Sequence, residues 1–383
     1  MKSNLFDDDH AVFRDSVRRF VQRHVVPNMD RWDDQRLIDR ETWLAAGQQG
    51  ILGLNVPEQY GGPSEPDYRF RVVIQEELAR VGANALQAAF AGNDDMALSY
   101  LLRHADAEQR RRWLPGFVTG HTIAAIALSE PSAGSDLRGM KTTAVQDGGG
   151  FILHGSKTFV SNGSSCDLAV VFARTDPAAG SQGFSLFVVE DGMEGFIRGR
   201  KLDKVGMHAQ DTAELFFNEV RVPQRNLLGE VGAGFAYLME SLPLERLSIA
   251  VAGQASAETV FTWTIQYVTQ RTAFGKTISE FQAPGFQLAE LATAIEVSRA
   301  YIDRCVREHN NGTLTAVDAA KAKYWATEMQ ARVVDTGVQM HGGYGYMLEY
   351  PVAKAFIDTR AQRIYGGTNE IMKEIIRRDI FQR

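Results

Sequence analysis

The order of secondary-structure patterns along the chain constrains its fold more than any other feature. From about residue 121 to 225, short β-rich runs alternate with turn residues, and beyond Gly232 helical patterns return and are longer. Because helices and strands do not alternate one by one, the pattern excludes a doubly wound sheet of βαβ units. Over the first 120 or so residues, apolar side chains recur at the spacing of amphipathic helices, for example at Phe6, Val12, Phe13, Val17, Phe20, Val21 and Val25.

This order predicts an α+β fold with three domains. We expect an N-terminal helical domain over residues 1–120, a central antiparallel β domain over 121–231 and a C-terminal helical bundle over 232–383. Two or three domains also agree with the chain length of 383 residues.

Local signals place several turns and helix ends. Turn residues at Asp147-Gly148 separate two β-rich runs and predict a hairpin. Pro243 interrupts a helical pattern, so it predicts either a new helix start or a kink. Capping boxes that open the next two helices are predicted at Ser279 with Gln282 and at Thr315 with Asp318.

Charge, cysteine content and the start of the chain narrow the functional classes. The 41 Lys+Arg against 47 Asp+Glu give a net charge of −6 and no basic surface for a nucleic-acid backbone. Only two cysteines are present, which excludes a disulfide scaffold and favours a reducing compartment. No apolar run approaches the roughly 20 residues of a membrane span. With Asp7, Asp8 and Asp9 near its start, the chain lacks the pattern of a targeting segment, and we expect a cytoplasmic protein.

Four stretches combine glycine, hydroxyl and aromatic residues in ways that suit a ligand. Residues 127–139 follow an apolar strand and offer amides and hydroxyls to a phosphate or to the polar edge of a ring cofactor. Residues 155–163 place Phe159 and Ser161 on one face of a strand. Residues 339–345 contain three glycines, and 366–368 would place glycine amides at a helix N-terminus. Each stretch alone also fits an ordinary turn, core strand or helix cap.

Taken in this order and spacing, the four stretches resemble the acyl-CoA dehydrogenase family over essentially the whole chain. Its first signature is matched by residues 127–136 with Gly139, and QRTAFGKTI from Gln270 also matches. The resemblance implies a homotetrameric or dimeric flavoprotein with a C-terminal four-helix bundle and FAD between domains and subunits. The second signature is matched by Gln339, Gly342, Gly343, Gly345, Glu349, Lys354 and Asp358.

The resemblance also implies which residues would hold FAD. Beside the flavin ring it places Leu128, Ser129, Phe159 and Ser161, with Ser135 nearer the pyrophosphate or the thioester arm of the substrate. Toward the neighbouring subunit's FAD it places Arg271, Phe274, Gln282, Gln339 and Gly343. Thr368 and Glu370 would lie by the diphosphate and adenosine end.

The general base is where this sequence departs from many family members. The family's reaction removes an α proton and a β hydride from an acyl thioester, which requires a base and donors to the thioester oxygen. Many members carry Glu directly before the last Gly-Thr, where this chain has Gly366. Long-chain and isovaleryl-type members place the base in an LER segment, where this chain has Glu245. The resemblance therefore implies Glu245 as base, although a Glu beside Arg246 is also typical of a solvated helix face.

Other roles near the base follow from the same resemblance. Gly366 would act through its backbone N–H on the thioester carbonyl, Arg246 would help hold the site, and Tyr365 would flank the thioester. The expected substrate is acyl-CoA or an acyl thioester on a carrier protein, and the expected oxidant is an electron-transfer flavoprotein. A flavin oxidase or monooxygenase on the same fold, and a binding protein without catalysis, remain alternatives. Asp94 and Asp95 are expected at a solvated helix start rather than in the acyl tunnel.

Overall fold

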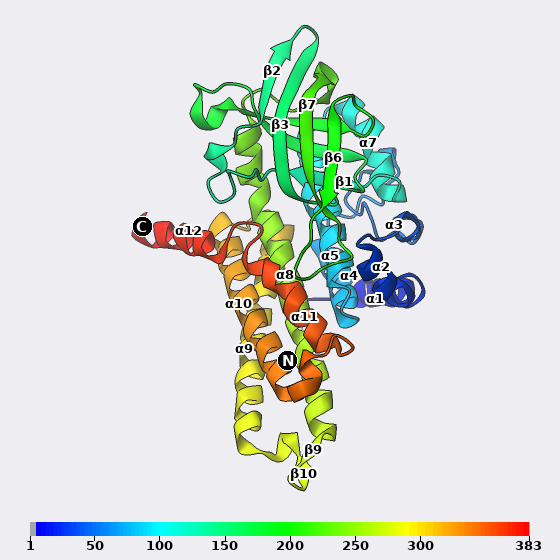
Figure 1. Cartoon of the computed structure of the whole chain (residues 1–383), viewed down its shortest axis with the longest axis vertical. Helices are drawn as coiled ribbons and strands as arrows, with labels where there is room; N and C mark the ends of the chain where they lie inside the picture. Colours follow the sequence, from blue (N-terminus) through cyan, green and yellow to red (C-terminus); the bar gives the residue numbers. More distant parts are fainter. Residues whose placement is uncertain (1–4, 383) are drawn as a thin grey trace.

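The computed structural model describes residues 5–382, apart from the side chain of the last one, and follows the predicted order of helices, strands and helices (Figure 1). A π-helical turn, Val21–Val25, continues α1, and a second one, Gly92–Ala97, precedes α6. The N-terminal helices are α1 (Asp8–Phe20), α2 (Met29–Gln35), α3 (Arg40–Gln48), α4 (Tyr68–Arg80), α5 (Asn84–Ala91), α6 (Leu98–His104) and α7 (Ala107–Thr119).

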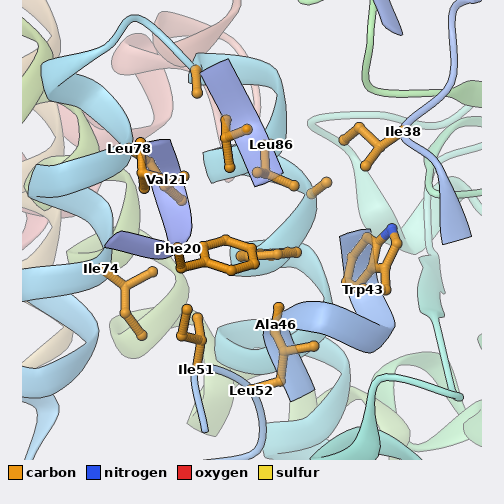
Figure 2. Packing of buried hydrophobic residues seen from close by; sticks show 14 of the residues in the cluster. Phe20, Val21, Ile38, Trp43, Ala46, Ile51, Leu52, Ile74, Leu78 and Leu86 are labelled. Atoms are coloured by element: carbon orange, nitrogen blue, oxygen red, sulfur yellow. The ribbon is translucent and has the colours of Figure 1, made fainter. Parts of the chain in front are cut away.

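The N-terminal helices share one core. Figure 2 shows side chains from α1, α3, α4 and α5 converging on the ring of Phe20. Trp43 of α3 packs edge-on against Phe90 of α5, with ring centroids 4.9 Å apart. Asp94 and Asp95 lie beside this region but are buried and paired with Arg71, so the expectation of a solvated helix start was wrong. The two adjacent acids in the sequence do not show that Arg71, on α4, pairs with them.

The central sheet lies in the upper part of Figure 1, above most of the helices and beside α7, and has the strand order β6-β7-β3-β2-β4-β5-β8. The predicted hairpin is confirmed, because Asp147 of β2 pairs with Gly150 of β3. The expected antiparallel pairing holds for most strands, but β1 and β2 pair with β4 in parallel. The connection from 128 to 167 is long enough for the crossover that parallel strands need. The strands are β1 (Ala124–Ala127), β2 (Thr143–Asp147), β3 (Gly150–Ser161), β4 (Leu168–Arg174), β5 (Phe184–Glu190), β6 (Phe196–Lys201), β7 (Thr212–Pro223) and β8 (Leu227–Leu228).

A long helix, α8, connects the sheet to the far end of the C-terminal bundle (Figure 1). Pro243 lies inside it, so this proline does not start a new helix. Thr315 caps α10, because its side chain accepts from the Asp318 amide as predicted. The capping box predicted at Ser279 with Gln282 was wrong: α9 begins without a side-chain cap, and a box of Thr277 with Glu280 opens the short 3₁₀ turn before it. The C-terminal elements are α8 (Gly234–Gln270), β9 (Thr272–Ala273), β10 (Lys276–Thr277), α9 (Gln282–Asn310), α10 (Ala316–His341), α11 (Pro351–Thr359) and α12 (Asn369–Gln382).

Neither cysteine is placed for chemistry. Cys166 and Cys305 are unpaired and buried, and burial raises the pKa of each thiol to about 12, which keeps it protonated. Within residues 5–382, no three His, Cys, Asp or Glu side chains form a group that could hold a metal ion. No helix in the same range combines the length and the apolar character needed to cross a bilayer.

Candidate functional site

Glu245 is a buried carboxylate on α8, with only 8% of its surface exposed. The hydroxyl of Tyr100, on α6, donates to its Oε1 at 2.9 Å. Burial raises the pKa of Glu245, while the Tyr100 hydrogen bond and the positive charge of Arg246 act in the opposite direction. Among the described residues, no donor contacts Oε2. A buried carboxylate with a raised pKa and one free oxygen is suited to accept a proton near neutral pH, and it is not on a solvated face.

The turn at Gly366 lies against the same part of α8. Arg246 Nε donates to the Gly366 carbonyl at 3.3 Å, and Lys323 Nζ, from α10, donates to the Gly367 carbonyl at 2.8 Å. In the part of the chain that the structure describes, the Gly366 amide makes no hydrogen bond. Burial, together with the positive charge of nearby Arg246, lowers the pKa of Lys323 to about 7. Two basic side chains thus fix the carbonyls of this turn and leave one amide available to a ligand oxygen.

A side chain at position 366 would strain the backbone and would push against Ile249. Gly366 has a φ of 67°, a backbone conformation that residues other than glycine rarely adopt. A Cβ there would lie 2.3 Å from Cδ1 of Ile249, which follows Glu245 by one turn of α8. A carboxylate at 366 would therefore displace Ile249, whereas Glu245, one turn earlier on the facing helix, already places a buried carboxylate there.

The loop after β1 is fastened to β3 by a buried ion pair. Lys157 is completely buried, and its Nζ donates to Glu130 at 2.8 Å and to the Leu128 carbonyl at 3.1 Å. The Thr158 amide donates to the Ser129 carbonyl at 2.9 Å. Leu128 and Ser129 are half-buried here, whereas Ser135 lies farther along the loop and is exposed. The sequence interpretation missed Lys157 and Glu130, although a lysine inside a β-rich run was a usable signal for a buried pair.

Phe159 points outward from a bulge in β3. The pairing with β7 shifts register between Lys157 and Val160, and Phe159 has a φ of 57° and is 71% exposed. Bulges redirect side chains in this way, and here the ring emerges next to the loop after β1, with Ser161 half-buried two residues later. An exposed aromatic ring beside loop amides and hydroxyls fits a planar cofactor such as a flavin.

A second group of predicted residues gathers at the far end of the bundle. Arg271, Gln339 and Gly343 line one cavity of about 800 Å³. Phe274, in the β9–β10 turn, is 97% exposed, and Gln282 begins α9 nearby and is exposed. At about 1.5 Å per helical residue, roughly 39 Å of α8 separate Glu245 from Arg271. One chain therefore does not bring this group to the site around Glu245.

The remaining predicted residues lie next to the Gly366 turn. Thr368 is half-buried and accepts from the Ile371 amide at 3.4 Å, so its hydroxyl caps α12. Glu370 is exposed in the first turn of α12. Tyr365 packs against the N-terminal core shown in Figure 2, and burial raises its pKa.

Comparisons with known proteins agree with this arrangement. Three family models match: acyl-CoA dehydrogenase N-terminal domain over residues 7–121, middle domain over 125–220 and C-terminal domain over 232–381. The chain is 46% identical over 378 residues to a long-chain specific acyl-CoA dehydrogenase of Sus scrofa, covering 98% of this chain and 87% of that protein. It is 36% identical to an isovaleryl-CoA dehydrogenase of Solanum tuberosum, covering 99% and 92%. The crystal structure of an acyl-CoA dehydrogenase from Geobacillus kaustophilus superimposes with a TM-score of 0.96 at 47% identity, covering 99% and 100%.

Proposed function

Because the chain belongs to the acyl-CoA dehydrogenase family, we propose that it is an FAD-dependent enzyme that converts an acyl thioester to its trans-2-enoyl form with Glu245 as base. The assignment of Glu245 as base depends on one observation, namely that a buried carboxylate and a backbone amide without a partner in the described part of the chain lie on facing segments. Glu245 is a buried carboxylate with a raised pKa, and Gly366 has an amide without an internal partner.

The chain's own residues account for the proton transfer. Glu245 takes the α proton of the thioester on its free oxygen, and the Gly366 amide donates to the thioester carbonyl, where negative charge develops. One such donor typically contributes about 2.7–4 kcal/mol in the transition state. Arg246 and Lys323 hold the turn so that this amide keeps its direction. The flavin, when bound, supplies the acceptor for the β hydride.

Residues of the β domain would hold the flavin ring. Phe159 offers an exposed aromatic face, and Ser161 and Ser129 offer hydroxyls at its edge. The Lys157–Glu130 pair fixes the loop that carries Ser129. The core around Glu245 excludes water from its carboxylate.

The direct test is reduction of the bound cofactor by substrate. Acyl-CoAs of graded chain length are added without oxygen to the purified yellow protein, and flavin absorbance is followed. We expect bleaching by at least one thioester, because Glu245 and the Gly366 amide supply both functions that the chemistry requires. Absence of bleaching by every CoA and carrier-protein thioester would refute the dehydrogenase assignment. Fast recovery of colour in air would instead favour an oxidase, and recovery only with an electron-transfer flavoprotein would favour the expected partner.

We also infer a homo-oligomer in which the far-end cavity completes the FAD site of a neighbouring subunit, in a tetramer or a dimer. The support is the roughly 39 Å between Arg271 and Glu245 on one helix and the exposure of Phe274. A ring that is 97% exposed, next to a cavity lined by arginine, suits an anionic cofactor and an apolar contact from another copy.

Mixing two inactive variants tests this arrangement. Glu245→Gln subunits lack the base, and Arg271→Glu subunits would repel the neighbour's FAD diphosphate. A hybrid pair has one site with both wild-type residues, so unfolding and refolding a one-to-one mixture with FAD should restore about a quarter of wild-type activity. The control is each variant refolded alone. A mixture no more active than its components would contradict a shared site.

A further inference from the structure

We propose that Tyr100 is a positioning residue, which orients the Glu245 carboxylate and sets the pH range in which this base works. The proposal rests on the proposed function, because it assigns a role to Tyr100 through Glu245. The observation behind it is a hydrogen bond of 2.9 Å between two buried side chains that are 145 residues apart in the sequence.

The ring of Tyr100 is held firmly. It is completely buried in the core between α6, α7 and the sheet, and it packs edge-on against Phe172 of β4, with ring centroids 5.9 Å apart. Ser241, one turn before Glu245 on α8, lies close to the same hydroxyl. The hydroxyl therefore has little freedom to turn away from Glu245. A carboxylate on a flexible side chain gains a fixed direction from such a partner, with Oε1 occupied and Oε2 left for the substrate.

The electrostatic setting makes Tyr100 a permanent donor. Burial and the charge of Glu245 both raise its pKa well above the ordinary tyrosine value, so it stays protonated wherever the enzyme works. The other charged groups that act on Glu245 are Arg103 on α6 and Arg246 on α8, and both favour the ionised carboxylate. Tyr100 is the group that adds a directional hydrogen bond to these two charges.

Removal of the Tyr100 hydroxyl should change the pKa of Glu245 in one direction. A donor to the charged form of a carboxylate lowers its pKa, so removal of the donor raises the pKa of Glu245. The base must be ionised to accept a proton, and the rate therefore rises with pH through this pKa. The acid limb of the pH profile should move to higher pH when the hydroxyl is removed.

The experiment compares Tyr100→Phe with Tyr68→Phe. Tyr68 is a matched control, because it is also buried and its hydroxyl donates to a different carboxylate, that of Asp95, at 3.4 Å. For Tyr100→Phe we expect the acid limb of the rate of anaerobic flavin reduction to move up by about one pH unit, which lowers the rate about tenfold at a pH on that limb. KM and FAD content should stay unchanged, since the Tyr100 ring is completely buried in the core and its hydroxyl is bonded to Glu245. Tyr68→Phe should keep the wild-type limb.

A second variant protects the test against a folding defect. Incorporation of 3-fluorotyrosine at position 100 keeps the ring and makes the hydroxyl a stronger donor, so the limb should move down rather than up. The proposal would be overturned if the acid limb of the pH profile stayed at the wild-type pH in both position-100 variants. It would also be overturned if Tyr68→Phe moved this limb as far as Tyr100→Phe does. Failure of the proposed function can be told apart from failure of this proposal, because the flavin of Glu245→Gln would then bleach at the wild-type rate.

Discussion

Replacing Glu245 by glutamine is expected to slow anaerobic flavin reduction by acyl thioester about 10²- to 10⁴-fold, the usual contribution of a general base. Glutamine has nearly the same size, and its carbonyl oxygen can still accept from Tyr100 at the position of Oε1. The amide has no basic oxygen for the α proton. The measurement is the rate of flavin bleaching in single-turnover mixing.

Two comparisons separate this chemical effect from a structural one. Glu240→Gln changes an acid on the same helix whose side chain is 58% exposed, and its rate should equal that of the wild type. Stability and FAD content of Glu245→Gln should be retained, because glutamine keeps the size of the side chain and the oxygen that accepts from Tyr100. A Glu245→Gln enzyme that bleached within a few-fold of the wild-type rate would show that the base lies elsewhere.

The fold follows from the sequence because its main signals are local. Helical spacing and β-rich runs report burial of one face of each element, and the Asp147-Gly148 turn needs only neighbouring residues. The misplaced capping box shows the limit of such signals, since Ser279 and Thr277 are both able to cap and only the folded backbone selects Thr277. Parallel pairing of β1 with β4 depends on a long connection and has no local pattern.

The residues of the site also differ in how far the sequence indicates them. Glu245 and Gly366 are singled out by the resemblance to the family, in which the base stands at one of these two positions, because the local pattern beside Arg246 also fitted a solvated face. The structure adds that Glu245 is buried and that its neighbour Arg246 contacts the Gly366 turn. Tyr100 and Lys323 could not be predicted, because each acts through a contact with a segment distant in the sequence. The outward ring of Phe159 depends on a bulge and a positive φ, which a strand pattern does not reveal.

The buried ion-pair cluster beneath this site is expected to contribute the largest single side-chain effect on stability. Arg71 Nε donates to Asp95 at 2.9 Å, and its Nη1 donates to Asp94 at 3.3 Å. Ser248, one turn beyond Glu245 on α8, donates to Asp95 at 2.6 Å, which links the cluster to the helix that carries the base. Arg71→Met would leave two buried carboxylates without their cation, which typically costs about 3–5 kcal/mol of unfolding free energy.

The pH dependence distinguishes this loss from a packing defect. Burial raises the pKa of Asp94 even with Arg71 present, and removal of the cation should raise it further. Between the unfolded and folded pKa values the folded state binds more protons, so the stability of Arg71→Met rises as pH falls. Denaturant unfolding should therefore show a larger deficit at pH 8 than at pH 5, with part recovered on adding Asp94→Asn and Asp95→Asn. Arg80→Met, a change on the same helix at a side chain 57% exposed, should cost below about 1 kcal/mol at either pH. A deficit independent of pH would indicate that lost packing, and not the unpaired carboxylates, destabilises the variant.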